Sequence, residues 1–394
     1  MTRPMTRRDR LMATLRGEPV DRPPVSLYEI GGLPMDPTDP DPYNVYHDPS
    51  WRPLLELAEE ETDLIRMRSA VRAQSHVAWD QASPSAARSV RDELMRTESW
   101  EQDGCRHTRV TVQIGGRQLT CQMRREKDVD TLWTVEHLLK DRDDLLAYLQ
   151  LPDEFFDQPI AVDPLAAEEQ SVGDRGIVMV DTEDPLCAAA TLFSMQDYTI
   201  VAFTERALFH QLLQKLAGPL QRRTEQVSRA FPGRLWRIYG PEYAAEPYLP
   251  PQLFEEYVVR YVTPMVEAIH AHGGWVRIHS HGRTRHLLDM IVGMQADAID
   301  PLEPPPLGDV TMDYVRERYG QQLVLFGNVE VADIERMEPA QFDTLVCQTL
   351  EQGTAGQGRG FVLMPTACPV GRKIEPRTLT NYQTLVRRAV NWGG

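Results

Sequence analysis

The chain has 394 residues, of which 42% are hydrophobic and 25% are charged, and its net charge is −16. This composition is ordinary for a globular protein, and the length allows a sizeable core or a large barrel domain. The acidic balance argues against nucleic acid or an anionic membrane as a partner, because both attract a basic face.

No apolar run approaches the roughly 20 residues that a membrane helix needs, and the basic N-terminal stretch lacks the apolar region of a secretory signal. The five cysteines are scattered along the chain and indicate no disulfide framework. We therefore expect a protein of the reducing cytoplasm, in which a cysteine is more often a small buried hydrophobe than a ligand.

The N-terminal residues predict an amphipathic helix with Leu11, Met12 and Leu15 on one face, which ends at a Gly- and Pro-rich turn. Downstream, short runs of apolar residues alternate with segments of helical character. Strands are predicted at 25–30, 63–68, 177–181, 235–240, 275–282, 297–300, 323–328 and 360–364. Helices are predicted at 51–61, 135–149, 189–195, 251–272, 285–294, 312–319, 339–352 and 378–392, with a long helix within 205–231.

A different pattern interrupts this alternation between about residues 100 and 126. Residues 109–114 and 118–123 alternate with period two around Gly115-Gly116, which predicts a β-hairpin. We interpret the hairpin as an insertion that either covers the mouth of the domain or forms a homodimer contact, and the residues favour neither reading.

Eight strands with helices between most of them predict an α/β fold, the TIM (β/α)8 barrel, in a single domain over residues 1–394. The N-terminal helix is then an extension of the barrel and the hairpin is an insertion in it. A doubly wound open sheet has the same alternation and is the alternative. The strand count and the length favour the barrel.

Polar residues at the carboxyl ends of the strands are the candidate site, because barrel enzymes place their chemistry there. In strand order they are Tyr28 and Glu29; Arg66 and Arg68; Asp181, Glu183 and Asp184; Tyr239, Glu242 and Tyr243; His279 and His281; Asp300 and Glu303; Asn328 and Glu330; and Cys368. From these we select Asp181, Tyr239 and Glu242 as candidate catalytic residues, and Tyr28, Arg66, Arg68 and Asn328 as candidate substrate-binding residues.

Each of these assignments has a structural alternative. Arg66 and Arg68 are more often ion-paired scaffold than substrate clamps. A loop glutamate such as Glu242 is usually solvated, and Asn328 can serve only to cap the turn after its strand.

The most specific feature is the pair His279 and His281, which are two residues apart on a strand and therefore point to the same side. Glu303 and Cys368 follow later strands, so they can converge on the pair. Imidazole, carboxylate and thiolate are the ligands that zinc accepts, and the four residues predict a zinc site. The alternative is that both histidines are simply hydrogen-bonded at a strand end and that the lone cysteine is structural.

Several motifs occur together along the chain. They are 15–24 (LRGEPVDRPP), 131–137 (TLWTVEH), 279–282 (HSHG), 298–304 (AIDPLEP), 319–320 (YG), 327–329 (GNV) and the late Cys368. This combination resembles the uroporphyrinogen decarboxylase superfamily over nearly the whole chain. The resemblance implies a TIM barrel, in agreement with the strand count.

One branch of this superfamily decarboxylates uroporphyrinogen without metal or cofactor and holds the substrate with an N-terminal arginine-rich segment. The matching stretch here, residues 28–33, contains no arginine, and Cys368 stands where those enzymes place a late histidine. A metal-free carboxy-lyase, with Asp181, Tyr239 or Arg66 at the substrate, is therefore the alternative function.

The other branch contains zinc methyltransferases that work with corrinoid proteins and share a His-x-Cys pattern followed by a late cysteine. The resemblance places His279 first, His281 in the position of the first cysteine and Cys368 last, while Glu303 matches the glutamate of the similar cobalamin-independent methionine synthase. The leading hypothesis is a zinc-dependent methyltransferase that uses a corrinoid carried by a partner protein. A non-catalytic protein that binds a corrinoid or another small ligand is a third hypothesis.

Overall fold

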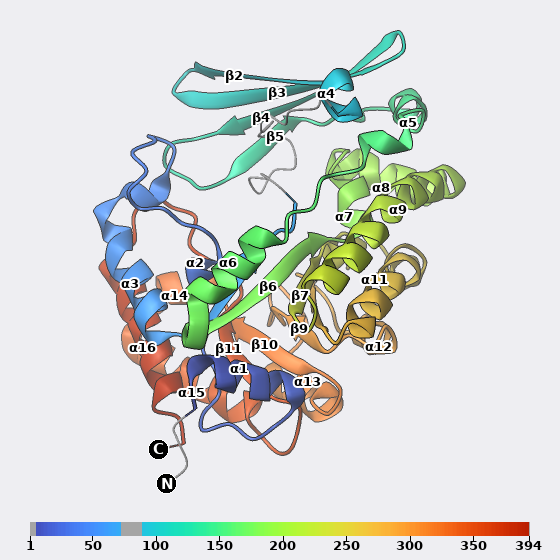
Figure 1. Ribbon diagram of the computed structural model, residues 1–394. Helices are drawn as coiled ribbons and strands as arrows, with labels where there is room; N and C mark the ends of the chain where they lie inside the picture. Colours follow the sequence, from blue (N-terminus) through green and yellow to red (C-terminus); the bar gives the residue numbers. More distant parts are fainter. Residues whose placement is uncertain (1–4, 72–88, 394) are drawn as a thin grey trace.

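The computed structural model describes residues 5–71 and 89–393. Its centre is a curled sheet of seven parallel strands in the order β1-β6-β7-β8-β9-β10-β11 (Figure 1). They are β1 (Leu64–Arg68), β6 (Gly176–Glu183), β7 (Leu235–Tyr239), β8 (Trp275–His279), β9 (Ala298–Asp300), β10 (Val324–Val329) and β11 (Phe361–Pro365). These strands are largely buried, as expected for a parallel sheet with both faces covered.

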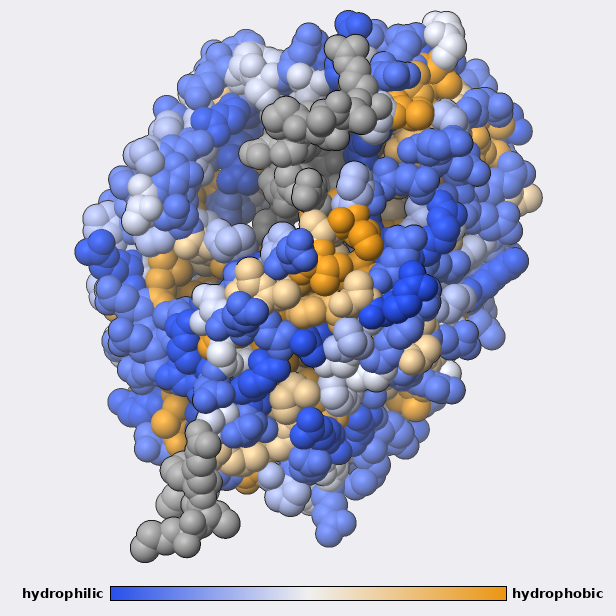
Figure 2. Space-filling model, viewed as in Figure 1, coloured by the Kyte–Doolittle hydropathy of each residue, from blue (hydrophilic) through white to orange (hydrophobic). Residues whose placement is uncertain are grey.

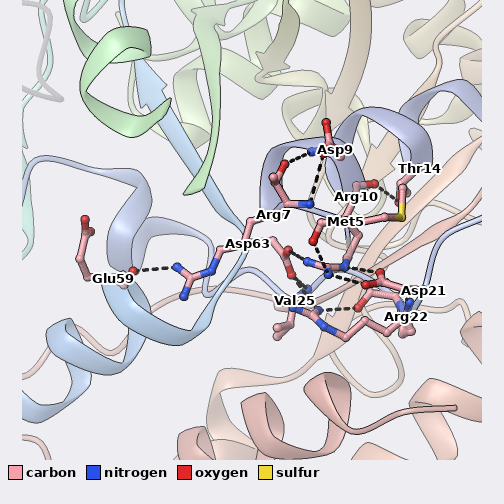
Figure 3. A network of polar contacts seen from close by, with 12 residues as sticks. Met5, Arg7, Asp9, Arg10, Thr14, Asp21, Arg22, Val25, Glu59 and Asp63 are labelled. Atoms are coloured by element: carbon pink, nitrogen blue, oxygen red, sulfur yellow. Dashed lines mark hydrogen bonds and ion pairs between the residues drawn. The ribbon is translucent and has the colours of Figure 1, made fainter. Parts of the chain in front are cut away.

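The residues around Val25 fill the gap between the two ends of this sheet. Val25 forms a parallel bridge to Leu363 of β11, and its carbonyl accepts the backbone N–H of Asp63, just before β1, at 2.7 Å. The Asp63 carboxylate accepts the Val25 N–H at 2.9 Å and also binds Arg10 and Arg22 (Figure 3). The sheet is thereby closed, and the predicted TIM barrel is confirmed.

The first strand differs from its prediction over 25–30, because the extended backbone does not continue beyond the Val25 bridge. Tyr28 has a φ of 59° and Gly31 a φ of 82°, and the chain turns there into α2 (Glu29–Gly32). A positive φ is incompatible with a continuing strand. This turn brings the Tyr28 side chain into the barrel.

Helices surround the barrel, and α1 (Arg7–Arg16) closes it at the amino ends of the strands. Leu11 and Leu15 of α1 pack on inward-facing strand residues such as Ile177, Leu235 and Val324. The remaining helices are α3 (Arg52–Glu61), α4 (Val90–Leu94), α5 (Arg142–Tyr148), α6 (Asp163–Val172), α7 (Pro185–Ala190), α8 (Met195–Thr204), α9 (Arg206–Ala230), α10 (Pro251–Phe254), α11 (Arg260–Ala271), α12 (Leu288–Gly293), α13 (Met312–Tyr319), α14 (Val331–Arg336), α15 (Pro339–Gly353) and α16 (Pro376–Val390). Short 3₁₀ or π turns are η1 (Val45–His47), η2 (Pro49–Trp51), η3 (Asp153–Phe155), η4 (Gly173–Arg175), η5 (Pro241–Ala244) and η6 (Glu255–Val259).

The predicted hairpin is confirmed, but it is the centre of a larger antiparallel sheet. Its four strands are β2 (Met95–Gln102), β3 (Cys105–Ile114), β4 (Arg117–Arg125) and β5 (Leu132–Glu136). β5 corrects the predicted helix over 135–149, of which only α5 is helical, because the aromatic and β-branched residues 133–135 favour a strand. Val110, Val112 and Leu119 are buried in the same apolar cluster as the helices around the barrel. In Figure 1 the sheet lies at the end of the barrel toward which β6 runs.

On the face shown in Figure 2, hydrophilic residues predominate and hydrophobic residues form smaller groups between them. Within the described ranges, no helix combines the length and the apolar character needed to cross a bilayer.

Candidate active site

The side chains that face into the barrel change from apolar to charged along the strands. Met179 of β6 and Leu235 of β7 are apolar and buried near the amino ends. Two residues further along the same strands, Asp181 and Arg237 face each other, and Arg237 donates to Asp181 at 2.6 Å. The alternation of a strand thus places a charged layer above the apolar one.

Two arginines form the centre of this charged layer, and each is paired with a carboxylate. Arg237 also donates to the hydroxyl oxygen of Tyr28. Arg277 of β8 is 1% exposed, and its Nε lies 3.0 Å from Oδ1 of Asp300. Because both cations are matched by anions, the layer is close to neutral, and removal of one partner would leave a costly unpaired charge.

The two predicted metal-binding histidines lie directly above this layer. The ring centroids of His279 and His281 are 4.7 Å apart, and the rings are almost perpendicular at 86°. Nδ1 of His279 is 2.8 Å from Asp300 Oδ2, and Nδ1 of His281 is 2.7 Å from Glu303 Oε1. The structure therefore brings three of the four predicted metal ligands together.

The electrostatics of these contacts define the state of the histidines. Burial alone would raise the pKa of Asp300, but Arg277 and then His279 outweigh burial and lower that pKa to about 2. Burial likewise opposes ionisation of Glu303, yet the hydrogen bond with His281 lowers the pKa of this carboxylate. Both carboxylates are thus acceptors at neutral pH, so Nδ1 of each imidazole carries the proton.

The contact between His281 and Glu303 raises the pKa of the histidine, whereas it lowers the pKa of the carboxylate. Burial would lower the pKa of His281, but the hydrogen bond to Glu303 outweighs it and raises that pKa. When His281 is neutral, its Nε2 retains a lone pair, as does Nε2 of a neutral His279. This carboxylate–histidine arrangement is the one that orients histidine ligands in metal sites.

Cys368, the fourth predicted ligand, has a different partner. Its thiol donates to Oε2 of Glu29 at 2.8 Å. Burial and then the Glu29 carboxylate raise the pKa of this thiol well above its ordinary value. In this arrangement Cys368 is a protonated thiol rather than a thiolate ligand.

The side chains of the predicted ligands are therefore of types that bind zinc, but their present positions do not form a complete metal site. Glu303 uses its second oxygen as well, because Oε2 accepts the Gly282 N–H at 2.6 Å. Among residues 5–71 and 89–393, no three His, Cys, Asp or Glu side chains stand in a metal-binding arrangement. A metal held by all four predicted ligands would require Glu303 and Cys368 to exchange partners.

The structure places the candidate arginines Arg66 and Arg68 away from the histidine pair. On β1, Ile65 and Met67 face the barrel interior, so Arg66 and Arg68, which alternate with them, face outward. Arg66 lies 2.5 Å from Glu59 and 3.4 Å from Glu168, and Arg68 lies 3.1 Å from Glu168. These contacts match the scaffold alternative.

The other candidate residues lie at the carboxyl ends of the strands, as expected. The Tyr28 ring stacks on His279 at 5.9 Å with an interplanar angle of 19°. Tyr239 ends β7, and burial raises the pKa of its hydroxyl. Oε2 of Glu242 accepts the Gly240 N–H at 3.0 Å. Asn328 of β10 is 7% exposed, and its Nδ2 donates to the Leu302 carbonyl at 3.1 Å.

Two residues at this end of the barrel, Arg237 and Arg277, were not among the sequence candidates, and Glu330 was listed at a strand end without an assigned role. Arg237 and Arg277 lie at positions of the predicted strands that face into the barrel. A charged residue at such a position can be recognised in the sequence as a candidate site residue. Glu330 directly follows β10 and is 7% exposed. Its Oε2 accepts the Thr366 hydroxyl at 3.0 Å, while Oε1 is buried without a hydrogen-bond partner among the described residues.

Comparison with known proteins places this geometry in context. The uroporphyrinogen decarboxylase (URO-D) family model matches residues 136–388. Among solved structures, a methyltransferase from Methanosarcina mazei aligns with a TM-score of 0.59 and 16% identity, over 99% of this chain and 100% of that chain. At this identity the likeness supports the fold alone. No curated protein sequence matches the chain.

Two further solved structures are more distant. The IOLI protein with a binding zinc atom has a TM-score of 0.33 at 11% identity, over 64% of this chain and 86% of that chain. D-psicose 3-epimerase in the presence of D-fructose also has a TM-score of 0.33, at 10% identity, over 64% and 88% of the two chains. These scores are too low to bear on function.

Proposed function

The chain belongs to the uroporphyrinogen decarboxylase family, and from this premise we propose that it is a zinc-dependent methyltransferase, which moves a methyl group between a corrinoid protein and a small acceptor. The observation that supports the zinc site is the pair His279 and His281, each with Nδ1 held by a buried carboxylate. Such a carboxylate orients the ring and leaves Nε2 for a metal.

The predicted ligands are His279, His281, Glu303 and Cys368. Bound zinc would supply a positive charge that lowers the pKa of an acceptor thiol, alcohol or water. Because His281 stands where the similar methyltransferases carry a cysteine, the site has at most one thiolate. A less electron-rich site favours acidification of an alcohol or water over activation of a thiol.

The surrounding residues have proposed roles that follow from their positions. Tyr28, which stacks on His279, would form one wall of the acceptor site. Tyr239 ends the neighbouring strand β7 and Glu242 follows it, and both are the proposed proton-handling groups. Asn328 would contact the acceptor. Asp181 would act as a positioning residue through its ion pair with Arg237.

The zinc content of protein purified without added metal tests the proposal. We expect about one zinc per chain in the wild type and a much lower content in His279→Ala. A content far below one per chain that is unchanged by this substitution would refute the zinc site. Demethylation of methylcobalamin, followed by its absorption spectrum in the presence of candidate acceptors, tests the transfer itself.

A metal-free carboxy-lyase is the second candidate, and one observation favours it. Nη2 of Arg277 is buried without a hydrogen-bond partner among the described residues, and a guanidinium is well suited to hold a substrate carboxylate. Incubation with uroporphyrinogen in the presence of a chelator tests this function. Release of carbon dioxide that is lost in Arg277→Lys would support it, and no turnover would count against it.

A further inference from the structure

Glu330 is a buried carboxylate with one oxygen left unused. Its Oε2 accepts the hydroxyl of Thr366, which follows β11, and Thr366 in turn accepts the Val331 N–H at 3.2 Å. Its Oε1 has no partner among the described residues. A buried carboxylate oxygen without a partner destabilises the folded state, because folding removes its hydrogen bonds to water and supplies no replacement. Such an oxygen therefore calls for a cation or a proton.

The position of Glu330 in the barrel places this oxygen near the histidine pair. His281, Glu303 and Glu330 follow β8, β9 and β10, which are neighbours in the barrel. Burial and then the nearby Glu303 raise the pKa of Glu330 to about 7, and His281 acts on it in the opposite sense. Carboxylates and imidazoles are groups that coordinate divalent metals, and a bound cation would also offset the repulsion between the two carboxylates.

The other acidic or thiol groups near the pair are already engaged. Oδ2 of Asp300 contacts His279, and its Oδ1, which has no hydrogen-bond partner among the described residues, is ion-paired with Arg277 Nε at 3.0 Å. Glu303 contacts His281 and the Gly282 N–H. Cys368 donates to Glu29. Asp184 also has one unpartnered oxygen, but it follows β6, and its other oxygen caps α7. Glu330 is therefore the carboxylate near the histidine pair whose second oxygen is free to bind a cation.

We propose that Glu330, through Oε1, is a protein ligand of the metal at His279 and His281, and that Cys368 is not. This inference rests on the proposed zinc function. Asp300 and Glu303 then keep their present contacts and orient the two histidines. Two imidazoles and one carboxylate are a ligand set of catalytic zinc, and they leave the fourth position open for the acceptor. Thr366 positions the Glu330 carboxylate by holding its other oxygen.

Metal binding by five purified variants tests the inference. Zinc affinity is measured by competition with a chromophoric chelator for wild type, Glu330→Gln, Cys368→Ser, and two matched controls, Asp184→Asn and Cys187→Ser. Glutamine keeps the shape of Glu330 and its contact with Thr366, and the melting temperature of each metal-free variant verifies folding. Glu330→Asp is a second variant that keeps the charge but shortens the side chain.

We expect Glu330→Gln to weaken zinc binding by more than about 100-fold, beyond the loss typical of an outer contact. Cys368→Ser and both controls should bind zinc within about twofold of wild type. Cobalt(II) provides an independent readout, because a cysteine ligand produces a thiolate-to-cobalt charge-transfer band in the near ultraviolet. We expect no such band in the wild type.

The opposite results separate the two proposals. Tight zinc binding by Glu330→Gln, or a charge-transfer band that Cys368→Ser abolishes, would overturn the assignment of Glu330 while leaving the zinc function intact. Failure of the wild type to bind either zinc or cobalt(II) would overturn both.

Discussion

Substitution of Glu330 by glutamine should stabilise the metal-free protein at neutral pH. A buried carboxylate near the negative charge of Glu303 is unfavourable in its ionised form when no cation is bound. Glutamine retains the shape of the side chain and the contact with Thr366, but it carries no charge to bury. The expected gain in the free energy of unfolding therefore appears only where Glu330 is ionised.

The pKa of Glu330 gives the size and sign of the effect. It is raised from 4.5 to about 7, a difference of about 2.5 pH units. At about 1.36 kcal/mol per unit, the ionised group costs the folded state up to about 3 kcal/mol. Below pH 4.5 the carboxyl is protonated in both states and costs nothing. The cost grows as the pH rises through the unfolded and then the folded pKa, and it is constant above about pH 8.

Urea unfolding in the presence of a chelator, at intervals between pH 4.5 and 8, measures this effect. The difference between Glu330→Gln and wild type should rise from near zero to about 3 kcal/mol across this range. Glu351→Gln removes an exposed carboxylate with the same change in net charge and serves as the matched control. A difference that does not change with pH, or a variant less stable than wild type at pH 8, would refute the reasoning.

Three further substitutions test other parts of the structure. Asp300→Asn should lower the free energy of unfolding by about 3 kcal/mol, because it leaves Arg277 unpaired. It should also weaken zinc binding by about 10- to 100-fold, because His279 loses the carboxylate that orients it. Unchanged zinc affinity would contradict the orienting role of Asp300. Leu11→Ala should cost about 2–5 kcal/mol in urea unfolding at unchanged zinc affinity, since it opens a cavity at the closed end of the barrel. Arg66→Gln should cost about 1 kcal/mol and leave the KM for the acceptor within about twofold, whereas a large rise in KM would place Arg66 at the substrate.

The strands of the barrel are predictable from sequence where they are continuous apolar runs. Residues 177–181 and 323–328 have this pattern, and they are β6 and β10 in the structure. Both faces of a parallel strand are buried, so neither face tolerates a polar alternation. The run 25–30, which contains Ser26 and Glu29, also predicts a strand, yet it pairs as one only at Val25. Tyr28 has a φ of 59°, and its side chain contacts His279 and Arg237 from strands that are distant in sequence.

The location of the candidate site is also predictable, because strand ends share one face of a barrel. The hydrogen bonds within it are not. Cys368 is 339 residues from Glu29 in sequence, and no local pattern indicates that its thiol would donate there. Arg66 and Arg68 have suitable side chains for a substrate clamp, but one-residue alternation along β1 turns both outward.

The choice between Glu303, Cys368 and Glu330 as ligands depends on which atoms remain free. Residue type, position after a strand and the family resemblance together favoured Glu303 and Cys368, since both are donors that zinc accepts. The structure engages both oxygens of Glu303 and the thiol of Cys368 with other groups. Each of these contacts would have to be lost before either residue could bind a metal, whereas Glu330 Oε1 has no contact to lose. A cation that binds Glu330 displaces no existing hydrogen bond, whereas a cation that binds Glu303 or Cys368 must displace one. Glu330 is therefore the residue that a cation would bind first.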